Sequence, residues 1–100
     1  MTPEQFIENV SKEIDSLVAL YAQGSSGQTE VGTKLDSFGL PQETKEQVVG
    51  LIHQAINEST YNLICGLEGS ASLAGTQEIY TISDEQGNEL SGNLDGLFYE

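Results

Sequence analysis

The chain has no arginine and only three lysines, Lys12, Lys34 and Lys45, among its 100 residues. Aspartate and glutamate number 16, so the formal net charge is −13 at pH 7. Charged residues nevertheless make up only 19% of the chain, below the quarter or so that is typical of globular proteins. The acidity therefore comes from missing cations. Because such a surface repels nucleic acid and anionic lipid, we expect neither nucleic-acid nor membrane binding.

The shortage of cations is most severe after Lys45, where only His53 remains to oppose the carboxylates. These carboxylates are Glu46, Glu58, Glu68, Glu78, Asp84, Glu85, Glu89, Asp95 and Glu100. We expect this half of the chain to carry a persistent negative field, which can steer a basic partner into contact. The alternative is that the acidity serves only to keep the protein dispersed.

The chain also has little cysteine and no long apolar run. A single cysteine excludes an internal disulfide, so nothing indicates an oxidising compartment. The first residues, MTPEQFIENV, lack the basic and apolar regions of a signal peptide. No window reaches the eighteen or so apolar residues of a membrane span. We therefore predict a cytoplasmic protein.

Two long segments have the apolar spacing of helices. The first is predicted over residues 3–23, where Thr2 and Gln5 form a capping-box pattern around Pro3. The second is predicted over residues 42–65, and the weak helix formers NEST leave open a break near 58–60. Between the two helices, a short helical turn is expected around residues 34–38.

The remaining segment has the pattern of strands. The run TQEIYTIS alternates as a half-buried strand does, and DEQGNE follows it as a turn with a glycine. This pattern predicts a small antiparallel β-hairpin over about 77–91 and a short C-terminal element that is either a helical turn or a strand. The predicted fold class is therefore α+β, with two main helices packed on the hairpin in a single domain over residues 1–100.

The hairpin turn also has features of a calcium loop, because Asp84, Gln86 and Asn88 place oxygen atoms at alternate positions. In the EF-hand pattern, however, the sixth position is glycine, and here it is Glu89. A strand pattern rather than a helix also precedes the loop. The hairpin turn is therefore the favoured interpretation, and we predict no metal site and no cofactor.

Catalytic chemistry has few candidates in this chain. Cys65 and His53 are the only residues available for a Cys–His pair, and an unbroken helix would separate them by about 18 Å. Ser70 and Ser72 lie in the glycine- and serine-rich loop 66–76, which lacks a nucleophile-elbow motif. No lysine or arginine follows Lys45 to bind a phosphate. We therefore predict that the protein is not an enzyme.

The composition thus favours a small, acidic, non-catalytic protein-binding module of the immunity or inhibitor type, which engages a basic protein. The predicted partner-binding residues are acidic or aromatic and lie near the turn and the C-terminus: Glu68, Tyr80, Asp84, Glu85, Glu89, Asp95 and Tyr99. A competing hypothesis is a small ligand-binding or enzymatic domain that uses the loop 66–76 and Cys65. The same composition also suits an acidic chaperone or adaptor subunit, or a homo-oligomer whose apolar stripes are covered by a second copy.

Overall fold

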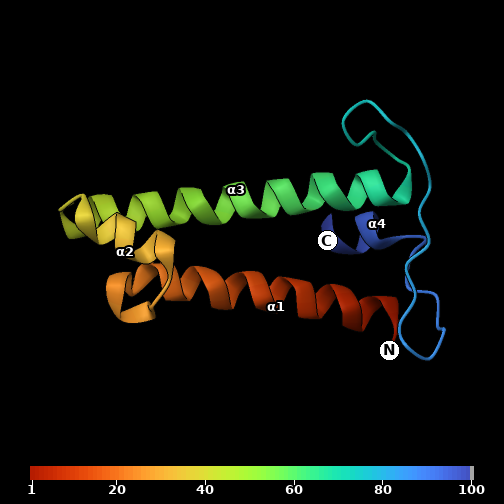
Figure 1. Ribbon diagram of the computed structural model, residues 1–100, viewed down its shortest axis with the longest axis horizontal. Helices are drawn as coiled ribbons and strands as arrows, with labels where there is room; N and C mark the ends of the chain where they lie inside the picture. The colour runs from red at the N-terminus through yellow and green to blue at the C-terminus, as the bar shows by residue number, and fades with distance from the viewer. Residues whose placement is uncertain (100) are drawn as a thin grey trace. The chain divides into compact units, whose positions relative to one another are not determined.

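The computed structural model describes residues 1–99, and 66% of the described residues are helical. Figure 1 shows the helices coloured along the chain. In chain order they are α1 (Pro3–Ala22), the short 3₁₀ helix η1 (Gly24–Gly27), α2 (Glu30–Ser37), α3 (Gln42–Glu68) and α4 (Leu94–Tyr99). No helix within the described part of the chain is both long and apolar enough to cross a membrane.

The contacts within the chain group into two compact units. Unit 1 combines Met1–Ser11 with the C-terminal segment that begins at Glu58, and unit 2 is Lys12–Asn57. The helices α1 and α3 each contribute residues to both units. Unit 1 therefore joins the two ends of the sequence, whereas unit 2 is one continuous segment.

The first helix begins as its sequence predicts. The backbone N–H of Gln5 donates to Thr2 Oγ1 at 3.1 Å, and the N–H of Thr2 donates to Gln5 Oε1 at 2.8 Å. This reciprocal capping box satisfies two backbone donors that have no partner inside the helix. Ile7, Ile14 and Val18 are buried at the seven- and four-residue spacing of one helix face.

The helix α2 is longer than the turn predicted at residues 34–38, because it begins four residues earlier, at Glu30, with Thr29 as its N-cap. Thr29 Oγ1 accepts from the N–H of Gly32 at 2.9 Å. Gly32 also allows α2 to approach η1 closely, since a Cβ atom there would lie 2.6 Å from the carbonyl oxygen of Gly24. Both glycines are buried. The lack of a side chain at Gly24 and Gly32 thus allows η1 and α2 to pack together.

The helix α3 runs through the segment 57–60 without a break. The break that the sequence left open near 58–60 therefore does not occur. Weak helix formers cost only a few tenths of a kcal/mol each relative to good ones. Half-buried Ile56 and buried Ile64 lie on either side of the segment, and burial of apolar side chains outweighs such small preferences.

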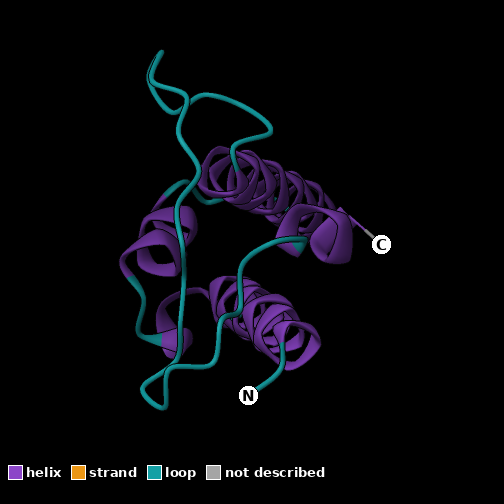
Figure 2. Ribbon diagram, turned by 90° about the vertical axis from the view of Figure 1, so that its right-hand side faces the viewer, coloured by secondary structure: helices purple, strands orange, loops and turns teal. Residues whose placement is uncertain are grey.

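The prediction of an α+β fold is wrong. Residues 1–99 contain four α-helices and no β-strand, and Figure 2 shows only helices and loops. The segment 77–91, predicted as a hairpin, is an extended loop with one isolated antiparallel bridge between Ser83 and Glu89. A second isolated bridge joins Leu73 and Thr76.

Backbone pairing between the two halves of this segment ends at Ile82, whose carbonyl accepts from the N–H of Leu90 at 2.7 Å. The N–H of Tyr80 donates to the carbonyl of Leu67 at 3.0 Å, and the N–H of Ile82 donates to Ser91 Oγ at 2.9 Å. The chain then turns at Gly92, which has φ +132°, and starts a helix at Leu94. The expected short C-terminal element is therefore the helix α4.

The core of unit 1 forms around three buried side chains from three helices. Ile7 of α1, Ile64 of α3 and Leu94 of α4 form one apolar cluster, and Leu94 is only 1% exposed. Four partly buried residues pack against it: Phe6, Ile82, Leu97 and Phe98. The loop 77–91 thus contributes to this core through Ile82.

Candidate partner-binding surface

Charge is divided unevenly between the two units. All three lysines and His53 lie in unit 2, together with six carboxylates. The described residues of unit 1 include no lysine, arginine or histidine, and their only formal cation is the α-ammonium group of Met1. They carry nine carboxylates: Glu4, Glu8, Glu58, Glu68, Glu78, Asp84, Glu85, Glu89 and Asp95. Unit 1 is therefore the more negative of the two units.

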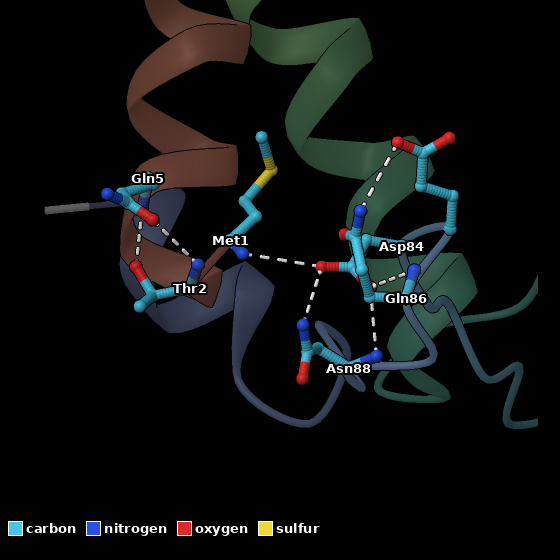
Figure 3. Close-up of polar contacts among 7 residues, drawn as sticks. Met1, Thr2, Gln5, Asp84, Gln86 and Asn88 are labelled. Atoms are coloured by element: carbon cyan, nitrogen blue, oxygen red, sulfur yellow. Dashed lines mark hydrogen bonds and ion pairs between the residues drawn. The ribbon is translucent and has the colours of Figure 1, made fainter.

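Asp84 organises the turn between residues 84 and 88 (Figure 3). Its Oδ1 accepts from the N–H groups of Gln86 and Asn88 at 3.0 and 2.9 Å. Its Oδ2 accepts from Asn88 Nδ2 at 3.0 Å and from the Met1 ammonium at 3.3 Å. The Asp84 side chain is only 11% exposed. Both oxygens thus have partners within unit 1.

These partners change the acidity of Asp84. The side-chain amide and the backbone N–H of Asn88 and, to a smaller extent, the Met1 ammonium lower its pKa from 3.8 to about 2. Each of these groups stabilises the ionised form. Asp84 is therefore a carboxylate that stabilises its own loop and leaves little of its side chain exposed to a partner.

Glu68, at the C-terminal end of α3, caps a different element. Its carboxylate accepts from the N–H of Gly92 at 2.7 and 2.9 Å and from the N–H of Leu94 at 2.6 Å. Leu94 is the first residue of α4, whose first N–H groups have no intrahelical partner. Glu68 therefore ties the start of α4 to the end of α3.

Asp95 also has an internal partner. Its Oδ2 accepts from the hydroxyl of Ser70 at 2.8 Å, and its Oδ1 accepts from the N–H of Gly96 at 3.0 Å. The Ser70 hydroxyl also lies 3.2 Å from the carbonyl oxygen of Cys65. The loop that follows α3 is thus linked to α4 by a serine–carboxylate pair.

Three aromatic side chains meet between α3 and α4. The rings of Tyr61 and Phe98 stack at a centroid distance of 6.4 Å, and Tyr99 lies tilted against Tyr61 at 5.6 Å. A hydrogen bond with Cys65 and an unfavourable electrostatic interaction with the same side chain raise the pKa of the Tyr61 hydroxyl. Tyr99 is 79% exposed. Tyr99 is therefore an exposed aromatic residue that packs against the ring of Tyr61.

Of the seven predicted partner-binding residues, Glu85, Glu89 and Tyr99 are exposed. Tyr80 is half-buried, and Asp84, Glu68 and Asp95 are half-buried groups with the structural contacts described above. Sequence reasoning missed Ile79, which is 81% exposed beside the exposed Glu78. The strand pattern gave no signal for it, because alternation predicts one buried face for every strand.

The candidate Cys–His pair does not form. The fold-back that it requires is absent, because α3 is continuous between His53 and Cys65. His53 Nε2 lies 3.1 Å from Asp15 Oδ1, a contact between α3 and α1 within unit 2. The thiol of half-buried Cys65 interacts instead with the hydroxyl of Tyr61.

The turn at Asp84 also lacks the geometry of a calcium site. Its carboxylate is directed to two backbone amides, a side-chain amide and an ammonium group. Within residues 1–99, no group of three or more His, Cys, Asp or Glu side chains is arranged to hold a metal ion. The alternate oxygens of this segment therefore serve as hydrogen-bond acceptors for the loop.

Comparison with known proteins adds no relative. No protein-family model matches the chain, and neither the curated proteins nor the solved structures give a match.

Proposed function

We propose that the chain is a non-catalytic protein-binding module that engages a basic partner through unit 1. One observation carries this proposal: the described part of unit 1 holds nine carboxylates and no cationic side chain. A surface of one charge sign raises the rate at which an oppositely charged protein associates. Inhibition of a basic toxin or nuclease, as immunity proteins do, is a role of this kind.

The exposed charged and apolar residues have different roles in the proposed binding. Glu85 lies on the turn that Asp84 organises, Glu89 directly follows this turn, and Glu78 lies in the segment that leads to it. Exposed charges of this kind mainly affect the association rate and the salt dependence of a complex. Tyr99 and Ile79 supply exposed apolar area, and interface energy is concentrated in such large side chains, tyrosine above all.

The internal hydrogen bonds of the other carboxylates favour a preformed surface. Glu68 fixes the start of α4, and Asp84 fixes the turn that contains Glu85 and precedes Glu89. A surface that is already ordered loses less conformational entropy when it binds. The proposed role of Glu68, Asp84 and Asp95 is therefore to shape the surface, and that of Glu85, Glu89 and Tyr99 is to contact the partner.

Matched charge variants test this proposal in a pull-down from the native cell. The first variant combines Glu78→Gln, Glu85→Gln and Glu89→Gln in unit 1. The control combines Glu13→Gln, Glu43→Gln and Glu46→Gln in unit 2, so both have the same net charge. We expect a basic partner to be retained by the control and weakened roughly tenfold by the first variant, and to be lost at high salt.

Tyr99→Ala, which leaves the charge unchanged, should also weaken the same complex by about tenfold. Equal loss of the partner in both charge variants would mean that net charge alone is responsible. Retention by both, or a captured protein that is acidic, would contradict the proposal directly.

A further inference from the structure

The helices α2 and α3 flank an open apolar groove of about 350 Å³ within unit 2. Its lining is mainly apolar: Val31, Leu35, Phe38, Val48 and Ile52. Leu35 is buried, whereas Val31 is 39% exposed and Phe38 is 60% exposed. Exposed apolar side chains grouped around a depression are typical of a surface that another protein covers.

The charges at the edge of this groove are balanced. Glu30 and Lys34 line it, and neither has an ion pair within residues 1–99. The nearby Lys45 is already paired with Asp36 at 3.2 Å. One carboxylate and one ammonium group give neither a basic nor an acidic partner a local advantage, so the groove differs from the uniformly negative surface of unit 1.

The spacing of these two charges makes the groove edge complementary to itself. Glu30 and Lys34 are four residues apart and lie on the same face of α2. When two copies of a helix pack antiparallel across a twofold axis, each end of one copy faces the opposite end of the other. Glu30 of each copy then faces Lys34 of the other, and the symmetry forms this pair twice.

We propose that a second copy of this chain covers the groove, with the two α2 helices packed antiparallel about a twofold axis. Val31 lies between the two charges in sequence and so lies near the axis, where its exposed surface is buried against the second copy. Phe38, at the end of α2, adds apolar area at the outer edge of the interface. Because α2 has only eight residues, the interface is small and the dimer is weak, as for interfaces below about 1,200 Å².

Sedimentation velocity on the isolated chain, from micromolar concentration to about 1 mM, tests the proposal. We expect a monomer–dimer equilibrium in the upper part of this range. Phe38→Ser should raise the dissociation constant about tenfold, since it removes an exposed aromatic group from the interface. Leu63→Ser, which removes an exposed apolar side chain from unit 1, is the control and should leave the equilibrium unchanged. Circular dichroism verifies that each variant keeps its helix content.

Charge reversal tests the antiparallel pairing itself. Glu30→Lys alone places like charges opposite each other and should abolish the dimer, and Lys34→Glu alone should do the same. An equimolar mixture of these two variants pairs opposite charges again, so a heterodimer should form. The variant that carries both substitutions should regain self-association.

Three results would overturn the proposal. The first is a wild-type chain that remains monomeric up to about 1 mM. The second is a mixture of the two charge variants that forms no heterodimer although both are folded. The third is a groove that binds a foreign amphipathic helix while the chain itself stays monomeric. None of these results depends on the basic partner of unit 1.

Discussion

The α-ammonium group of Met1 lies 3.3 Å from Oδ2 of Asp84, although 83 residues separate them in the sequence. This ion pair connects the N-terminal segment of unit 1 to the turn 84–88, which contains Glu85 and directly precedes Glu89 (Figure 3). The Met1 ammonium is also the only formal cation among the described residues of unit 1. The stability of this turn should therefore depend on the ionisation of Asp84.

Acid should weaken the fold through Asp84. Its pKa is lowered from 3.8 to about 2 in the folded chain, so its stabilising effect is fully present above about pH 4 and is lost as the pH falls toward about 2. We expect Asp84→Asn to lower the melting temperature at neutral pH and to reduce its decline between about pH 4 and 2. Thermal unfolding followed by circular dichroism measures both effects. The exposed Glu85→Gln is the control, and an Asp84→Asn variant with the pH dependence of the wild type would contradict the prediction.

Asp36 provides an independent test of how a carboxylate is stabilised. The backbone N–H and the hydroxyl of Ser25 lower its pKa to about 2 more strongly than Lys45 does. We therefore expect the Asp36 pKa to stay below 3.8 in both Lys45→Met and Ser25→Ala, because the backbone N–H of Ser25, which lowers the pKa most, remains in both variants. NMR titration of the side-chain carboxyl carbon reports the value directly. A pKa that returns to 3.8 in Lys45→Met would show that the ion pair dominates.

Gly24 should tolerate no side chain, for two reasons. It has φ +64°, and a Cβ atom there would overlap the Asp36 carboxylate. Gly39 has a similar φ of +63° but open space around the same position, so it isolates the backbone effect. We expect Gly39→Ala to lower the free energy of unfolding by about 1 kcal/mol and Gly24→Ala by about 2–4 kcal/mol. Urea unfolding of the two variants measures the difference, and equal losses would exclude a steric role for Asp36.

The cap that Glu68 provides for α4 should be measurable. Glu68→Ala leaves the N–H groups of Gly92 and Leu94 without their acceptor, and we expect a loss of about 1–2 kcal/mol in the free energy of unfolding. Amide hydrogen exchange in α4 should accelerate by the factor that corresponds to this loss of free energy. Glu78→Ala, an exposed carboxylate of the same unit, should change stability by about 0.5 kcal/mol or less.

Leu94 should be the most sensitive core position of unit 1. It is 1% exposed and packs with Ile7 and Ile64, so Leu94→Ala should cost about 2–5 kcal/mol through lost burial and the cavity left behind. The half-exposed Leu63 is the control, because Leu63→Ala removes the same atoms and should cost less than about 1 kcal/mol. Chemical unfolding of both variants gives the comparison.

The helices were predictable because their signals are local. The capping box of Thr2 and Gln5 and the spacing of Ile7, Ile14 and Val18 lie within the helix that they specify. The absence of the predicted hairpin could not be foreseen in the same way, because a strand needs a partner and β-propensity depends strongly on context. The alternation in TQEIYTIS is real, but Gly92 and α4 occupy the place where a paired strand would continue.

The candidate surface shows the same limit. The negative charge of the C-terminal half was visible in the sequence, since no lysine follows Lys45. The internal hydrogen bonds of Glu68 and Asp95 were not visible, because their partners lie 24 to 26 residues away in the sequence. Neither a charge count nor a spacing pattern separates a carboxylate that caps a helix from one that faces solvent.

The confinement of all three lysines to residues 12–45 also decides which reagents can act on each unit. Trypsin cleaves after lysine and arginine, so its sites are Lys12, Lys34 and Lys45, all within unit 2. The segment from Glu46 onward leaves a digest as one peptide, even from the unfolded chain. Enzymes that acylate or ubiquitinate lysine side chains, and amine-directed cross-linkers, are likewise restricted to unit 2, apart from the α-amino group of Met1. The negative surface of unit 1 can therefore be followed through proteolysis and chemical labelling of the rest of the molecule without itself being cut.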